Sequence, residues 1–203
     1  MRKIKKILET LKFNGVEKII SFSGGSDLDK KVRGVIEESI QYLSDKPVAI
    51  LNGGTEGGTP AYSTICAKDY SLPVIGVFPS RGKKYLLPGL DFKIEVPQRY
   101  RESCWGDETE IFGKLSDGAI IIGGEIGTMH EFAYLMQINK SKLKRGEIPI
   151  YVAPIAGIQD DSCFSDIIPS LPIPLNVRSS SLPEQRFFTG REAAQFLIDK
   201  LKL

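Results

Sequence analysis

Three glycine-rich turns contain the residues with the most obvious capacity for chemistry. Each follows a short apolar run and precedes a segment with helical spacing, at residues 23–26, 52–60 and 123–128. Glycine lets the backbone turn sharply and approach a ligand where a Cβ would clash. A helix that starts in such a turn offers free N–H groups and a positive dipole end to a phosphate. The residues expected to hold the ligand are Ser23, Gly24, Gly25, Gly53, Gly54, Thr55, Gly123, Gly124, Glu125, Gly127 and Thr128.

Two carboxylates are the candidate catalytic residues. Glu131 falls about one turn into the third predicted helix start, near enough to hydrogen-bond a ribose hydroxyl or to act as a base. Glu108 lies upstream, and two carboxylates across one pocket can divide acid and base work as an oxocarbenium-like state develops. The alternative for Glu108 is a solvated residue in the first turn of a helix, where the dipole favours an acid. Both interpretations stay open, as does a purely structural role for the glycine turns.

Other side chains near these turns give weaker indications. Trp105 either stacks on a base or, as is commoner for a lone tryptophan, packs in the fold. His130 is expected to face away from the ligand, and Cys104 has no histidine partner that would make it a nucleophile. Surface solubility is the commoner reason for basic residues in loops. The basic residues considered for a phosphate are Arg81, Lys83, Lys84, Arg99 and Arg101.

Composition limits the class of protein. The 203 residues are 41% hydrophobic and 26% charged, with a net charge of +2, which indicates a globular α/β protein without a nucleic-acid signal. No run reaches the roughly 18 apolar residues of a membrane span. The 3 cysteines are widely separated and there is 1 histidine, which argues against a disulfide framework and a histidine-rich metal centre. We expect a cytoplasmic protein without membrane attachment, metal or cofactor.

Alternating strand and helix patterns predict the fold. We expect one three-layer, Rossmann-like α/β domain over residues 1–203, in which helices flank a mainly parallel sheet. Apolar runs predict strands at 17–22, 47–51, 73–78, 91–96, 119–122 and 148–152, and an edge strand at 175–177. Helices are predicted at 1–16, 27–44, 59–70, 104–115, from 128 onward and at 189–203. A charged turn is predicted at 140–147, and a loop with a short helix at 153–174.

Two details of the predicted helices bear on the site. The helix from residue 128 is expected to bury Met129, Phe132, Ala133 and Met136 on one face. Thr189 begins a Thr-x-x-Glu pattern, which predicts a capping box at the start of the last helix. The three glycine turns would then lie along the carboxyl edge of the sheet, where ligands of doubly wound folds bind.

The turn at 123–131 resembles a known signature. Its sequence is similar to the Pro-Gly-Gly-x-Gly-Thr-x-x-Glu motif of LOG-like proteins, which are often mislabelled lysine decarboxylases and belong to the SLOG superfamily. The Gly-Gly-Thr run at 53–55, followed by a helix and the strand at 73–77, resembles that superfamily too. The Trp-Gly-Asp-Glu run at 105–108 and the Gly-Gly-Glu run at 123–125 resemble more closely the prokaryotic SLOG branch related to the cytoplasmic domain of TRPM channels. The resemblance covers about residues 17–155.

The resemblance implies a Rossmann-like, often dimeric protein that binds a nucleotide or its derivative. LOG enzymes hydrolyse the N-glycosidic bond of a nucleoside 5′-monophosphate, whereas other SLOG domains act as nucleotide sensors. Gly124, Gly127 and Thr128 match the phosphate-holding turn of the motif, and Glu131 matches its glutamate.

This sequence departs from the LOG pattern at two places. Gly123 stands in place of the opening proline, and Glu125 in place of the second glycine of the pair. The LOG arginine upstream should fall near residues 108–109, which are glutamate and threonine here, so an acid replaces a positive charge. No pyridoxal-phosphate lysine motif is visible, which argues against a lysine decarboxylase. The sequence predicts a homo-oligomeric protein that binds a nucleotide or phosphosugar, with Glu131 and Glu108 acting in an N-glycosidase as the alternative.

Overall fold

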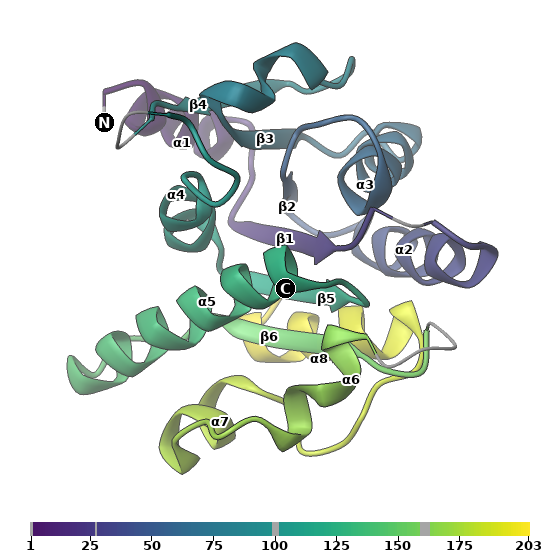
Figure 1. Cartoon of the computed structure of the whole chain (residues 1–203), viewed down its shortest axis with the longest axis vertical. Coiled ribbons are helices and arrows are strands. Elements are labelled where there is room, and N and C mark those ends of the chain that lie inside the picture. The colour runs from purple at the N-terminus through teal and green to yellow at the C-terminus, as the bar shows by residue number, and fades with distance from the viewer. Residues whose placement is uncertain (1, 27, 99–101, 159–162) are drawn as a thin grey trace.

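A six-stranded parallel sheet forms the centre of the molecule (Figure 1). The computed structural model describes residues 2–26, 28–98, 102–158 and 163–203. The strands lie in the order β4-β3-β2-β1-β5-β6, and every pairing is parallel. Their bounds are β1 Lys18–Gly24, β2 Val48–Asn52, β3 Val74–Pro79, β4 Phe92–Val96, β5 Gly118–Ile122 and β6 Tyr151–Ile155. The predicted Rossmann-like α/β fold is confirmed.

Helices cover both faces of this sheet. They are α1 Arg2–Phe13, α2 Lys30–Leu43, α3 Gly58–Asp69, η1 Ser80–Tyr85, α4 Thr109–Leu115, α5 Ile126–Lys144, α6 Phe164–Ile167, η2 Ile168–Ser170, α7 Leu175–Ser181 and α8 Gly190–Leu201. Buried side chains of α2, α3 and α8 pack against Ile20, Ile50 and Ile120 on one face. Those of α1 and α4 pack against the opposite face of β1, β2 and β3, while α5, α6 and α7 cover that face of β5 and β6.

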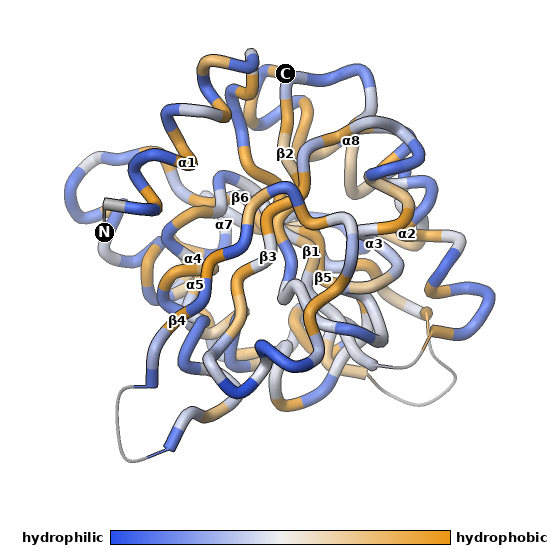
Figure 2. Tube along the Cα trace, turned by 90° about the horizontal axis from the view of Figure 1, so that it is seen from above, coloured by the Kyte–Doolittle hydropathy of each residue, from blue (hydrophilic) through white to orange (hydrophobic). Residues whose placement is uncertain are grey.

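Burial on two faces explains why the strands are continuous apolar runs. All five residues of β5 are buried, including Ile120, Ile121 and Ile122, and each such side chain contributes about 1.5–3 kcal/mol when removed from water. Figure 2 shows the same distribution, with hydrophobic residues along the central strands and hydrophilic ones in the outer turns. The strands therefore provide a rigid frame for the loops at their ends.

The strand order reverses beside β1. The chain runs outward from β1 to β4, crosses back through α4, and continues with β5 on the other side of β1. At the carboxyl end, Gly24 of β1 pairs in register with Ile122 of β5. In open α/β sheets this reversal opens a crevice outside the strand ends. The loops after β1 and β5 meet there.

Several predicted element boundaries were wrong. Residues 175–177 begin helix α7 rather than an edge strand, because Pro174 occupies its N-cap position and Val177 is buried in the core. Helix α5 continues through most of the predicted charged turn to Lys144, since its lysines stay in water while Leu135 and Met136 are buried. The last strand, β6, lies at 151–155 rather than 148–152, because the Asn139 side chain hydrogen-bonds both backbone groups of Ile150 and holds the preceding segment outside the ladder.

Two further differences concern residues beside the strand ends. The predicted helix at 104–115 begins only at Thr109, and the residues before it form a turn. Met129 and Ala133 are exposed rather than buried, while Phe132 and Met136 face the core as predicted. The capping box at Thr189 is present, with both reciprocal hydrogen bonds. Among the described residues, none of the helices has the length and apolar character required to cross a membrane.

Candidate functional site

The turn between β5 and α5 is shaped by two glycines. Gly123 and Gly124 have φ values of 58° and 88°, in the left-handed region that favours glycine. A Cβ on Gly124 would collide with the side chain of Thr128. Helix α6 fixes the turn from behind, because Phe164 N–H donates to Gly124 O at 2.9 Å and Gly123 N–H donates to the Ser165 hydroxyl at 3.1 Å. The first turn of α5 is thereby aimed at the crevice beside β1.

A cavity of about 880 Å³, here called the main cavity, opens at this point. Its volume lies in the range of pockets for small organic ligands. The walls come from the end of β1, the turn before α4 and the first two turns of α5. The lining residues are Gly24, Gly25, Ser26, Trp105, Gly106, Glu108, Thr109, Glu125, Ile126, Gly127, Thr128, Met129, His130, Glu131 and Ala133.

Glu131 connects α5 to the end of β1. The Ser23 hydroxyl donates a short hydrogen bond to Glu131 Oε2. Burial raises the pKa of Glu131 to about 7, the Ser23 hydrogen bond opposes this rise, and the charge of Glu108 adds to it. Glu131 therefore exchanges a proton near neutral pH.

Glu108 faces the same cavity from the start of α4. Its Oε2 accepts a hydrogen bond from Gly106 N–H at 2.9 Å. Burial is the main cause that raises the pKa of Glu108 above its ordinary value, while backbone N–H groups and His130 lower it. Glu108 is half-buried rather than a fully solvated first-turn residue. The structure thus places both candidate carboxylates in one cavity.

The other predicted ligand residues divide into three groups. Gly24, Gly25, Glu125, Gly127 and Thr128 line the main cavity, and Ser23 reaches it through Glu131. Gly123 and Gly124 form the turn behind it without lining it. The third group, Gly53, Gly54 and Thr55, lies outside the main cavity.

Gly54, in the loop after β2, has a packing role. Gly54 has φ of 65°, and a Cβ there would lie 2.8 Å from Cα of Gly76 on the neighbouring strand. Its N–H donates to the Asn52 side chain at 2.9 Å, and that same side chain donates to Ser63 and Thr64 of α3. This network fixes the loop after β2 against α3.

A second cavity of about 390 Å³, here called the basic cavity, adjoins the loop after β2. It is lined by Thr55, Glu56, Arg81, Lys84, Tyr85 and Trp105. Trp105 lines both cavities. The Arg81 guanidinium lies 5.7 Å from the centre of the Trp105 ring. Two of the basic residues considered from the sequence therefore share one cavity.

The remaining candidates have other positions. Lys83 forms an ion pair with Glu95 at 3.2 Å and does not line the basic cavity. Arg99 and Arg101 lie outside the described residues. His130, which was expected to face away, lines the main cavity. The sequence analysis also missed Ile126 and Met129 as lining residues, because helical spacing alone does not show which apolar residues face a cavity. Within the described part of the chain, no group of three or more His, Cys, Asp or Glu side chains could hold a metal ion.

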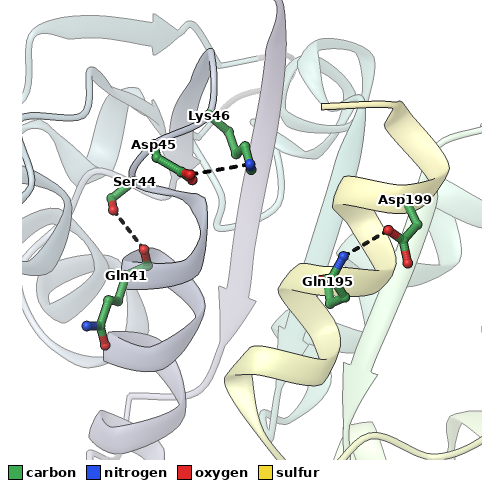
Figure 3. Close-up of polar contacts among 6 residues, drawn as sticks. All are labelled: Gln41, Ser44, Asp45, Lys46, Gln195 and Asp199. Carbon is green, nitrogen blue, oxygen red and sulfur yellow. Dashed lines mark hydrogen bonds and ion pairs between the residues drawn. The ribbon is translucent and has the colours of Figure 1, made fainter.

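A groove between α2 and α8 lies away from the switch point beside β1. This groove measures about 510 Å³, and the polar contacts drawn in Figure 3 lie within single segments. The Gln195 amide donates to Asp199 at 2.8 Å, and Lys46 pairs with the adjacent Asp45 at 3.3 Å. The switch point beside β1 therefore remains the best candidate site.

Comparison with solved structures places this fold among known proteins. No protein-family model matches the chain, and no curated protein matches it in sequence. The protein TM1055 aligns over 90% of this chain and 99% of its own, with a TM-score of 0.70 and 19% identity. The molybdenum cofactor binding protein of Rippkaea orientalis aligns over 92% and 98%, with a TM-score of 0.64 and 17% identity.

Two further solved structures have the same fold. The molybdenum cofactor carrier protein of Chlamydomonas reinhardtii aligns over 92% of this chain and 99% of its own, with a TM-score of 0.63 and 17% identity. DNA processing protein A of Streptococcus pneumoniae aligns over 93% and 63%, with a TM-score of 0.57 and 16% identity. At these identities the comparisons establish the shared fold, and function has to be argued from the site.

Proposed function

We propose that this chain is an SLOG-type protein that binds a nucleotide or a nucleotide derivative in the main cavity. The observation that carries the proposal is the glycine turn of Gly123 and Gly124, which delivers the N-terminus of the 19-residue helix α5 into a cavity of about 880 Å³. A phosphoryl group placed there would meet the unpaired N–H groups of the first helical turn and the positive end of the dipole.

The carboxylates of the main cavity suit the nucleoside part of such a ligand. Glu108 and Glu131 present acceptors to ribose hydroxyls, and the exposed rings and chains of Trp105, Ile126 and Met129 offer apolar contact to a base. Two solved proteins of the same fold are named for binding or carrying the molybdenum cofactor. The molybdenum cofactor should therefore be included among the ligands tested for binding. Membership of the TRPM-related branch, a homo-oligomeric state and a cytoplasmic location stay predictions.

Gly127 offers a direct test of the phosphate position. A Cβ at Gly127 meets no atom within 4 Å, so Gly127→Val places two methyl groups in open space on the cavity wall without disturbing the core. Gly34 of α2 has the same open surroundings away from the main cavity, which makes Gly34→Val the matched control. Calorimetric titration with nucleotides should show binding by the wild type and Gly34→Val, and at least tenfold weaker binding by Gly127→Val. Equal affinity in all three contradicts the proposed site.

Hydrolysis of an N-glycosidic bond is a second candidate function, favoured by the position of Glu108 and Glu131 in one cavity. One ionised carboxylate would take a proton from water as the water oxygen bonds to the anomeric carbon. The other, protonated, carboxyl would give its proton to the departing base as the carbon–nitrogen bond breaks. The pKa of about 7 for Glu131 allows either state near neutral pH.

The two functions are separated by one assay. The protein is incubated with a panel of nucleoside 5′-monophosphates, and free base is measured by chromatography. Hydrolysis predicts base release that is lost in both Glu131→Gln and Glu108→Gln. Tight binding without base release contradicts hydrolysis and leaves the binding function in place.

A further inference from the structure

The main cavity and the basic cavity carry opposite charge. Glu108, Glu125 and Glu131 line the main cavity, where His130 is the one residue among the described lining side chains that can become positive. Arg81 and Lys84 line the basic cavity, with Glu56 as its one acid. A ligand that occupies both cavities therefore needs hydroxyl donors at one end and an anion at the other.

Trp105 forms the boundary between the two cavities and is held in place. A Cβ on Gly82 would lie 3.3 Å from two atoms of the Trp105 ring and 3.3 Å from Cγ2 of Thr55, so the 80–85 segment packs closely on both. Arg81 N–H donates to the Ser103 hydroxyl at 3.1 Å, which ties the same segment to the chain just before Trp105. These contacts position the 80–85 segment, which carries both cations, against the Trp105 ring.

The cations are also free to bind an anion. Arg81 and Lys84 are exposed, and each lies over an aromatic ring, at 5.7 Å from Trp105 and 4.8 Å from Tyr85, rather than in a described ion pair. Lys83, between them in sequence, is paired with Glu95 instead. A guanidinium and an ammonium in one small cavity are well matched to a phosphoryl group.

We propose that the basic cavity binds a second phosphoryl group of the ligand whose nucleoside part lies in the main cavity. The ligand class is then a nucleotide with at least two phosphoryl groups, and a nucleoside monophosphate fills only part of the site. This inference rests on the proposed function and extends it, because it names the ligand class and gives Arg81 and Lys84 a binding role.

Trp105 allows the test to be made by fluorescence, because it is the single tryptophan of the chain and lines both cavities. The wild type is titrated with adenosine 5′-monophosphate, adenosine 5′-diphosphate, adenosine 3′,5′-bisphosphate and a 5′-phosphorylated adenylyl dinucleotide. At least one of the three ligands with a second phosphoryl group should bind ten- to a hundredfold more tightly than the monophosphate, as expected for charge-assisted hydrogen bonds. The ligand that binds more tightly than the monophosphate shows where the second phosphoryl group belongs. It is adjacent to the first group, across the ribose from it, or on a second nucleotide.

The variants decide whether the gain comes from the basic cavity. Arg81→Ala with Lys84→Ala should reduce the gain to less than threefold and leave monophosphate affinity within threefold of wild type. Lys83→Ala removes one positive charge from the same segment outside the cavity, and should keep the full gain. Thermal unfolding confirms that each variant is folded, which is expected for exposed side chains.

The possible failures are distinguishable. This inference alone is overturned if the monophosphate binds and no second phosphoryl group increases the affinity. It is likewise overturned if the increase persists in the double variant Arg81→Ala, Lys84→Ala. Absence of binding by all four ligands overturns it together with the proposed nucleotide function. If the gain in affinity disappears equally in Lys83→Ala, it results from the overall positive charge of the segment, and the inference is also overturned.

Discussion

Replacement of Glu131 by glutamine should make the protein more stable above neutral pH. Burial raises the pKa of this carboxyl from its ordinary 4.5 to about 7, so the folded state prefers the protonated form. The contribution of Glu131 to the free energy of unfolding is greatest below pH 4.5 and declines as the pH rises from 4.5 to about 7. Above that value it stays constant. Glutamine carries no charge and removes this dependence.

The size of the effect follows from the two pKa values. The gap between 4.5 and about 7, at about 1.4 kcal/mol per pH unit, corresponds to a cost of about 3 kcal/mol for the ionised folded state. This is an upper value, because the Glu131 side chain is partly exposed towards the main cavity. We expect wild type and Glu131→Gln to have equal free energies of unfolding at pH 4.5, and Glu131→Gln to be about 2–3 kcal/mol more stable at pH 8.

Urea unfolding followed by circular dichroism at pH 4.5, 6, 7 and 8 measures this difference. Ser23→Ala is the companion variant, since it removes the hydrogen bond that lowers the pKa of Glu131. Its stability should keep declining to a higher pH than that of wild type. A difference between wild type and Glu131→Gln that is constant over the whole pH range would refute the burial of this carboxyl.

Three further substitutions test the frame of the site by thermal or urea unfolding. Gly124→Ala should cost about 1–3 kcal/mol, because its φ of 88° is unfavourable for alanine and the new Cβ collides with Thr128; no loss means that the turn relaxes freely. Asn139→Leu should cost about 2–4 kcal/mol, since both backbone groups of Ile150 lose a buried partner, and a neutral result shows that water replaces the side chain. Thr189→Ala should cost about 0.5–2 kcal/mol through loss of the capping box, whereas an unchanged midpoint indicates a frayed helix end.

The turn at the centre of the site was predictable because its signals are local. The β-branched run of β5, Gly123 and Gly124, and the helical spacing that follows them are adjacent in sequence, and each has one preferred backbone conformation. The parallel pairing of the strands follows from the alternation of strands and helices together with right-handed crossovers. Glu131 lies in the second turn of α5, where it accepts a hydrogen bond from Ser23 at the end of β1.

Features set by distant contacts were not predictable in this way. Helical spacing marked Met129 and Ala133 as inward, but both line the main cavity, so this face of α5 meets a cavity instead of a core. The apolar–polar–apolar segment at 175–177 fits a strand and a short helix equally, and contacts with the core decide between them.

The division of the site into two cavities has the same origin. The loop after β2 carries the same kind of glycine signal as the loop after β5, yet Gly54 is used to pack on Gly76. Thr55 consequently lines the basic cavity, whereas Glu131 lines the main cavity. The sequence gives no indication that the 80–85 segment and the turn at 103–107 meet at this ring.

Nucleotide binding at the start of α5 is tested most directly by amide chemical shifts during titration with adenosine 5′-diphosphate. We expect the largest changes at Gly127 and Thr128 and smaller changes at Gly24 and Gly25, and all of them should saturate together. Changes confined to the cavity between β6 and α7, which includes Arg178, would contradict it, as would a spectrum that does not change.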